Sequence, residues 1–146
     1  MRFLFSFLSL FFFSQIQASD SLHWTQDYPS ALMQAKKEGK PLFLYFTGSD
    51  WCPWCKKMDN EILKDPVFGK ALHDKLVFVL IDSPFKTQQP REVMEQNKQL
   101  KATFHVDSFP TVILLSPKEK VIARMGYQAI GGERYAKMVE NGLSKK

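Results

Sequence analysis

Residues 46–58 read FTGSDWCPWCKKM and hold both cysteines of the 146-residue chain. Residues 42–46 form an apolar run without polar alternation, which is typical of a buried central strand. Residues 47–50 have the composition of a turn, and Pro53 suits the first turn of a helix. Cys52 and Cys55 are therefore predicted to lie where a buried strand gives way to a helix.

Two cysteines separated by two residues can carry out disulfide exchange. In this reaction a thiolate attacks a sulfur and forms a mixed disulfide, which a second nearby thiol resolves. At a helix start, Cys52 lies near the positive end of the helix dipole and near unpaired N–H groups, which favour its thiolate. We assign attack to Cys52 and resolution to Cys55, which we expect to be more buried. A structural cross-link is the weaker interpretation, because closing so short a loop stabilises by only about 2 kcal/mol.

The residues that flank the two cysteines affect how the pair reacts. Pro53 has no N–H, so the helix start offers one donor fewer to the Cys52 thiolate. Trp51 and Trp54 flank the nucleophile, and aromatic surface beside a reactive sulfur suits an unfolded, apolar protein substrate. The alternative for both tryptophans is ordinary packing in the core.

Metal and haem sites also use cysteines at this spacing. Haem attachment requires His directly after the second cysteine, where Lys56 stands. Structural zinc needs two more ligands at suitable spacing, and His23, His73 and His105 are far apart. Copper(I) stays an alternative, because the two thiolates and Met58 are soft ligands. We expect no resident metal and no cofactor.

Apolar runs on both sides of the cysteines predict a βαβ unit. A short helix is predicted after Asp27, with Pro29 near its first position and Gly39 just past its end, and a second buried strand is predicted over residues 76–81. Helical material lies between the two strands, including a short helix after Asp65 with Val67 on its buried side. Two strands separated in this way favour a parallel pair with a right-handed crossover.

The second half of the chain has a different order. A helix is predicted over residues 90–101, with Asn97 weakening its apolar face. Residues 111–115 and 121–125 are predicted strands, and the five-residue link between them favours an antiparallel hairpin. A last helix is predicted after Gly131. The fold class is therefore α/β, with a βαβ half joined by a helix to a ββα half.

The chain begins with Arg2 and an apolar run over residues 3–13, as a secretory signal peptide does. The run is too short to span a bilayer, and we predict a leader at residues 1–18 and one domain at residues 19–146. An uncleaved anchor or a buried N-terminal helix is the alternative. Cleavage removes one charged residue and lowers the formal charge from +5 to +4. The remaining charges are scattered, so we expect no nucleic-acid binding. After cleavage of the leader we expect no stable membrane insertion.

The segment at residues 46–58 resembles the active-site segment of thioredoxin-like proteins. Residues 109–111, Phe-Pro-Thr, are similar to the cis-proline loop of that superfamily and the strand after it. Residues 126–127, Gly-Tyr, match the turn after the last strand. Within the superfamily the chain most resembles the exported DsbH type, including residues 22–24 and the polar insertion over residues 83–101.

This resemblance implies a thioredoxin fold, with a central mixed sheet flanked by helices, and a periplasmic location. It implies that Cys52 is the nucleophile, that Cys55 is the resolving thiol, and that Pro110 lies in cis beside them. A proline there donates no ladder hydrogen bond, so the backbone around Phe109 is left for an extended substrate. The substrate-binding residues that we expect are Trp51, Pro53, Trp54, Phe109 and Pro110.

The chain departs from ordinary thioredoxins beneath the cysteines. Tyr45 stands where thioredoxins carry a buried acid that relays a proton to the resolving cysteine, and Phe78 replaces the partner lysine of that acid. Asp50, Asp59 or water could take over the relay, and the sequence does not choose among them.

DsbH-like proteins are reductases, and the resemblance therefore implies that this chain reduces disulfides in exported proteins. The sequence contains no flavin or nucleotide motif, so we expect a membrane disulfide reductase to supply the electrons. We expect a monomer. The alternatives are a dithiol oxidase or disulfide isomerase on the same scaffold, a copper(I) carrier, and a binding module without catalysis.

Overall fold

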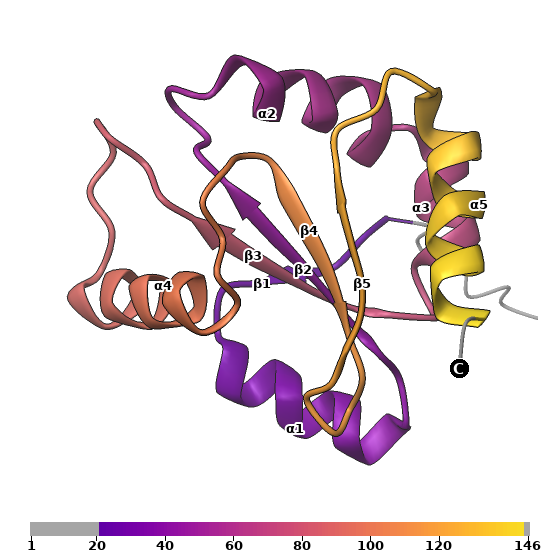
Figure 1. The fold of residues 1–146 in the computed structure, drawn as a ribbon, viewed down its shortest axis with the longest axis horizontal. Coiled ribbons are helices and arrows are strands. Elements are labelled where there is room, and N and C mark those ends of the chain that lie inside the picture. Colours follow the sequence, from indigo (N-terminus) through magenta and orange to yellow (C-terminus); the bar gives the residue numbers. More distant parts are fainter. Residues whose placement is uncertain (1–20, 145–146) are drawn as a thin grey trace, which may run out of the picture.

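The computed structural model describes residues 21–144, and a five-stranded sheet lies at its centre (Figure 1). The predicted leader at residues 1–18 lies outside the described residues. The strands are β1 (Trp24–Thr25), β2 (Leu42–Thr47), β3 (Val77–Asp82), β4 (Thr111–Leu115) and β5 (Val121–Gly126), in the spatial order β1-β3-β2-β4-β5. β2 is parallel to β3, and β4 is antiparallel to β2 and β5. The predicted parallel pair and the predicted hairpin are both confirmed.

Helices cover both faces of this sheet. They are α1 (Tyr28–Glu38), α2 (Pro53–Met58), the π-helical turn η1 (Asp59–Leu63), α3 (Pro66–Leu72), α4 (Arg91–Thr103) and α5 (Gly131–Ser144). Figure 1 shows α1 and α4 on one side of the sheet and α2, α3 and α5 on the other. Two buried apolar clusters lie between the sheet and these two helical layers. The mixed sheet flanked by helices is therefore confirmed.

The central strand β2 is buried along its whole length. Leu44 and Phe46 pack into the cluster beneath α1 and α4, whereas Phe43 and Tyr45 pack into the cluster beneath α2, α3 and α5. Side chains of a strand alternate between its faces, so a strand covered on both sides must be apolar at every position. This is why residues 42–46 show no polar alternation.

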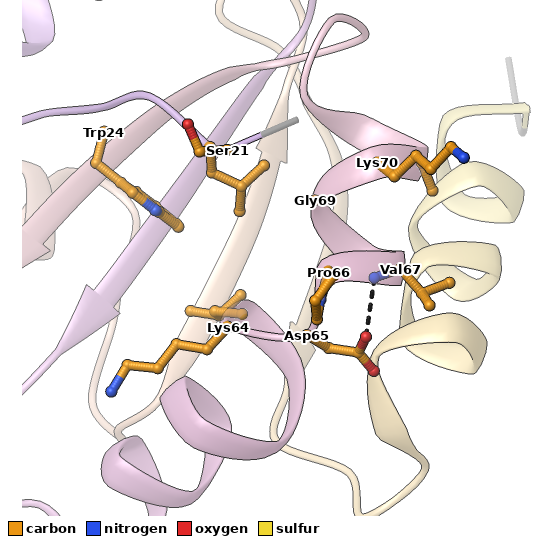
Figure 2. Close-up of a pocket in the computed structure, with 11 residues that line it drawn as sticks. Ser21, Trp24, Lys64, Asp65, Pro66, Val67, Gly69 and Lys70 are labelled. Atoms are coloured by element: carbon orange, nitrogen blue, oxygen red, sulfur yellow. Dashed lines mark hydrogen bonds between the residues drawn. The ribbon is translucent and has the colours of Figure 1, made fainter. Parts of the chain in front are cut away.

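Local signals fix the ends of two helices. The Asp27 carboxylate caps α1 by accepting the Ser30 N–H at 3.1 Å, and Gly39 ends the helix at a φ of 66°. The Asp65 carboxylate caps α3 by accepting the Val67 N–H at 2.9 Å (Figure 2), and it also accepts the Gly132 N–H at 3.2 Å. A Cβ on Gly132 would lie 2.4 Å from the Asp65 Cβ, so only glycine allows α5 to approach α3 this closely.

The structure differs from the sequence-based expectations in four places. Strand β1 was not expected, because two residues carry too little pattern. The turn η1 continues α2 with a wider helix. Val67 is 50% exposed rather than buried. Asn97 is buried, and its side-chain amide donates to the Asp82 carbonyl at 2.9 Å, so it ties α4 to the end of β3 instead of weakening the packing.

Within residues 21–144, no helix is both long enough and apolar enough to cross a membrane.

Candidate active site

The two cysteines lie at the start of α2, as the sequence predicts. Cys52 is the N-cap residue, and its Sγ accepts the Cys55 N–H at 3.2 Å. Pro53 occupies the first helical position, where its missing N–H leaves no intrahelical bond unmade. β2 ends at Thr47, and residues 48–51 turn the chain into the helix.

Cys52 and Cys55 are joined by a disulfide, with their Cα atoms 5.2 Å apart. Cys52 is 3% exposed and Cys55 is fully buried. The order of burial agrees with the assigned roles, although Cys52 is less open in the oxidised pair than the sequence suggests. A substrate sulfur from solvent can therefore reach the pair only at Cys52. The cap hydrogen bond and the helix dipole both favour negative charge on this sulfur when the pair is reduced.

Trp51 forms one wall beside the cysteines rather than part of the core. It is 42% exposed, and its indole N–H donates to the Ser83 carbonyl at 2.8 Å. The ring meets Phe109 edge to face, with the ring centroids 5.7 Å apart. Gly48 lies against the same ring, where a Cβ would be only 2.4 Å from it. The turn thus needs glycine at position 48 because the indole occupies the space of a side chain.

Trp54 lies between the two cysteines in the sequence and is 55% exposed. Its ring lies 5.7 Å from that of Tyr127, and the Lys57 ammonium lies 5.0 Å from the Trp54 ring centroid. A shallow hollow of about 340 Å³ is lined by Trp54, Phe109, Pro110 and Tyr127. Sequence reasoning did not name Tyr127 as a site residue, although an aromatic residue directly after the last strand was its signal.

The Phe109–Pro110 peptide bond is cis. It immediately precedes β4, which pairs with the strand that leads into the cysteine turn. The loop therefore lies at the same end of the sheet as the cysteine turn, and the expected residues Trp51, Trp54, Phe109 and Pro110 come together there.

Asp50 holds the loop that follows β3. Its carboxylate accepts the backbone N–H groups of Phe85, Lys86 and Thr87 at 2.8, 2.7 and 2.9 Å. These bonds, first of all the one from the Phe85 N–H, lower the pKa of Asp50 to about 2. Because Asp50 keeps its charge at neutral pH and serves this loop, it does not replace the missing buried acid.

Tyr45 and Phe78 are both buried, as their positions on the central strands predict. Phe78 packs against Trp24 and Phe43, with ring centroids 5.2 Å apart in each pair. The Tyr45 hydroxyl donates to Asp59 Oδ1 at 2.9 Å. The sequence leaves Asp50 and Asp59 as candidates for the missing acid. Of these two, Asp59 is the one hydrogen-bonded to the strand beneath the cysteines.

Two other features of the molecule bear on ligand binding. Within residues 21–144, no group of three or more His, Cys, Asp or Glu side chains is placed to hold a metal ion. A mostly apolar hollow of about 860 Å³ lies between the segment at residues 21–24 and α3 (Figure 2). The hollow contains neither cysteine. It is thus separate from the redox site.

Comparison with known proteins agrees with this geometry. The sequence model of the thioredoxin-like domain matches residues 28–142, and the chain belongs to the thioredoxin-like family. The chain is 39% identical over 126 residues to the disulfide bond reductase DsbH of Chlamydia pneumoniae, covering 86% of this chain and 75% of that protein. A solved structure of a DsbH oxidoreductase superposes with a TM-score of 0.82 at 38% identity, covering 86% of this chain and 87% of that one. With its cysteine pair, this protein is a DsbH-like thiol–disulfide oxidoreductase.

Two further proteins are similar to this chain, one in sequence and one in fold. The thioredoxin-related protein DsbJ of Chlamydia pneumoniae is 38% identical over 108 residues, which are 74% of this chain but only 31% of that protein. A thioredoxin from Thermus thermophilus superposes with a TM-score of 0.65 at 24% identity, covering 86% of this chain and 89% of that one. The second likeness concerns the fold alone.

Proposed function

We propose that this oxidoreductase works in the periplasm and reduces disulfides in exported proteins. The relative DsbH is named a disulfide bond reductase, and the apolar run at residues 3–13 has the pattern of an export signal. The observation that carries the proposal is the helix cap: Cys52 Sγ accepts the Cys55 N–H at 3.2 Å, while Cys55 has no exposed surface. This arrangement supports attack by Cys52 and resolution by Cys55.

The reaction consists of two exchanges at Cys52. Its thiolate attacks one sulfur of the substrate disulfide, a mixed disulfide forms, and the other substrate sulfur leaves as a thiolate that takes a proton from water. Cys55 then loses its proton and attacks Cys52 Sγ, which releases the second substrate sulfur. The substrate gains two electrons, and the Cys52–Cys55 pair becomes a disulfide. A membrane disulfide reductase returns two electrons to the pair.

The aromatic side chains around Cys52 suit an extended, unfolded polypeptide. Trp51 and Trp54 both expose ring surface, Trp54 lines a hollow with Phe109, Pro110 and Tyr127, and Trp51 contacts Phe109. Rings of this kind bury apolar side chains of many shapes at small entropic cost. The backbone beside Pro110 can pair with an extended substrate in the manner of an added strand.

A trapping experiment tests the roles of the two sulfurs. Replacing Cys55 with Ser should trap mixed disulfides through Cys52, which non-reducing electrophoresis of periplasmic extracts detects. The matched variant Cys52→Ser should trap none, because Cys55 is buried. Equal trapping by both variants would contradict the assignment.

Redox titration against glutathione tests the direction of the reaction. A potential near the roughly −270 mV of thioredoxin supports reduction, whereas a potential near the roughly −120 mV of the strongest disulfide-forming enzymes supports oxidation. The second result would replace the proposed reductase by a dithiol oxidase.

A further inference from the structure

Two lysine ammonium groups lie over aromatic rings that line the active-site hollow. Lys57 Nζ lies 5.0 Å from the centroid of the Trp54 ring, and Lys101 Nζ lies 5.6 Å from the centroid of the Phe109 ring. Both rings line the hollow of about 340 Å³. An ammonium group is attracted to the face of such a ring, so each positive charge is held at the ring instead of ranging over the reach of a flexible side chain.

The charge of Lys57 is not neutralised from within the protein. Glu61 follows Lys57 by four residues, a spacing at which lysine and glutamate often pair on a helix. Glu61 instead accepts a hydrogen bond from the Tyr127 hydroxyl, and within residues 21–144 Lys57 forms no ion pair. The exposed ammonium of Lys57 is therefore open to an acidic group that a substrate brings.

Lys101 lies in the last turn of α4 and likewise has no ion pair among the described residues. It also lines a neighbouring hollow of about 550 Å³, together with Lys98, His105 and Asp107. Two lysines and one aspartate line this hollow, so the surface next to Phe109 carries a net positive charge at neutral pH.

The acidic side chains around the cysteine turn, in contrast, accept hydrogen bonds from the protein itself. Asp50 accepts the backbone N–H groups of residues 85–87, and Asp82 accepts the N–H and the hydroxyl of Ser49. Asp59 accepts the hydroxyl of a buried tyrosine. These donors point their positive ends at the carboxyl groups and offset part of their charge. The site thus offers a substrate mainly positive charge.

We propose that Lys57 and Lys101 select polypeptides that carry acidic side chains beside the disulfide. This inference rests on the proposed function and names the class of substrate on which it acts. A substrate chain that packs on Trp54 and Phe109 brings its aspartate or glutamate side chains within reach of the ammonium group at each ring. Opposite charges speed the encounter of the two molecules and fix the register of the bound chain. Both lysines therefore determine specificity and take no part in the exchange itself.

Three synthetic peptides test this selectivity. Each contains one disulfide between two cysteines, and the peptides differ only in the residues that flank these cysteines, which are glutamate, glutamine or lysine. Reduced protein is mixed with each peptide at low ionic strength, and chromatography follows the peptide dithiol that forms as Cys52 and Cys55 become a disulfide. Flanking charges also change the reactivity of the peptide disulfide itself. Each rate is therefore divided by the rate at which dithiothreitol reduces the same peptide.

The variants compare the two lysines of the site with two lysines elsewhere. Lys57→Gln/Lys101→Gln removes both charges at the hollow. The control Lys118→Gln/Lys120→Gln removes two exposed charges from the turn between β4 and β5. This turn follows the end of β4 that is remote from the cis-proline loop, and both double variants have the same net charge.

With wild type, the normalised rate should be about threefold higher for the glutamate peptide than for the glutamine peptide, and about threefold lower for the lysine peptide. This preference should be lost in 1 M salt, where the Debye length is about 3 Å. The Lys57→Gln/Lys101→Gln variant should reduce all three peptides at similar normalised rates. The Lys118→Gln/Lys120→Gln control should keep the preference of wild type.

Equal normalised rates for the three peptides with wild type would overturn the inference and leave the proposed function standing. A preference that persists in Lys57→Gln/Lys101→Gln would also overturn it, and so would an equal loss of the preference in the control, because other charges would then be responsible. Failure of wild type to reduce any of the three peptides would instead contradict the proposed function, and the inference with it.

Discussion

Replacing Gly48 with Ala should displace Trp51 from the wall of the active site. A Cβ at position 48 would lie 2.4 Å from Trp51 Cε2 and 2.6 Å from Cζ2 and Nε1, distances that no packed pair of atoms tolerates. The indole is held by its hydrogen bond to the Ser83 carbonyl and by its contact with Phe109, so it cannot turn without losing both. The methyl group therefore acts on the site through this one ring.

The expected cost follows from the two contacts that are lost. A hydrogen bond from an indole to a carbonyl stabilises by about 1 kcal/mol, and an edge-to-face aromatic pair by about 1 kcal/mol. Gly48→Ala should therefore lower the free energy of unfolding by about 2 kcal/mol. In a Trp51→Ala background the same change should be neutral or stabilise by about 0.5 kcal/mol, because alanine restricts the unfolded chain.

A double-mutant cycle measures this difference directly. Urea unfolding of oxidised wild type, Gly48→Ala, Trp51→Ala and the double variant gives a coupling energy of about 2 kcal/mol if the clash with the ring is the cause. The fluorescence of Trp51 should also shift in Gly48→Ala, because the indole loses its fixed partner. An equal cost of Gly48→Ala in both backgrounds would refute the reasoning, since the methyl group would then act through the backbone and not through the ring.

Three other changes test separate features. Asn97→Ala should lower the free energy of unfolding by about 1–3 kcal/mol in denaturant titrations, because it leaves the partly buried Asp82 carbonyl without its donor. An unchanged midpoint would count against that bond. The pKa of Asp59 is raised above its ordinary value of 3.8, so the native state binds this proton more tightly than the unfolded chain does. As the pH rises from 3.8 through the raised pKa, the free energy of unfolding of wild type should therefore fall relative to that of Asp59→Asn. A rise of this difference in denaturation experiments would contradict the raised pKa. Trp54→Ala should slow the reduction of a protein disulfide about fivefold, because about 1 kcal/mol of aromatic contact with the substrate is lost. The rate with a small aromatic disulfide should not change. Equal slowing with both substrates would exclude a role of Trp54 in polypeptide binding.

Much of the fold could be predicted because the strongest patterns are local. The apolar run at residues 42–46 is buried on both faces, and the capping residues Asp27 and Asp65 accept the N–H groups that their positions imply. Burial of a strand and capping of a helix depend on neighbours in the sequence, so both can be recognised before the chain is folded. The two-residue strand β1 could not, because its only signal is pairing with β3.

The site could be predicted only where a motif was involved. Cys52 and Cys55 and the loop at Phe109 and Pro110 were named from the sequence, and they meet at one end of the sheet. Tyr127 was missed as part of the hollow, because only the return of β5 brings it to Trp54.

The residues of this chain by themselves determine its chemistry. A cysteine that caps a helix has a sulfur beside unpaired N–H groups, and a second cysteine one turn later is within reach of it, whatever the rest of the fold. Tertiary structure decides what surrounds that chemistry. It exposes Trp51 and Trp54, commits Asp50 to a loop, and places Asp59 on Tyr45, because each of these depends on contacts between segments that are distant in sequence.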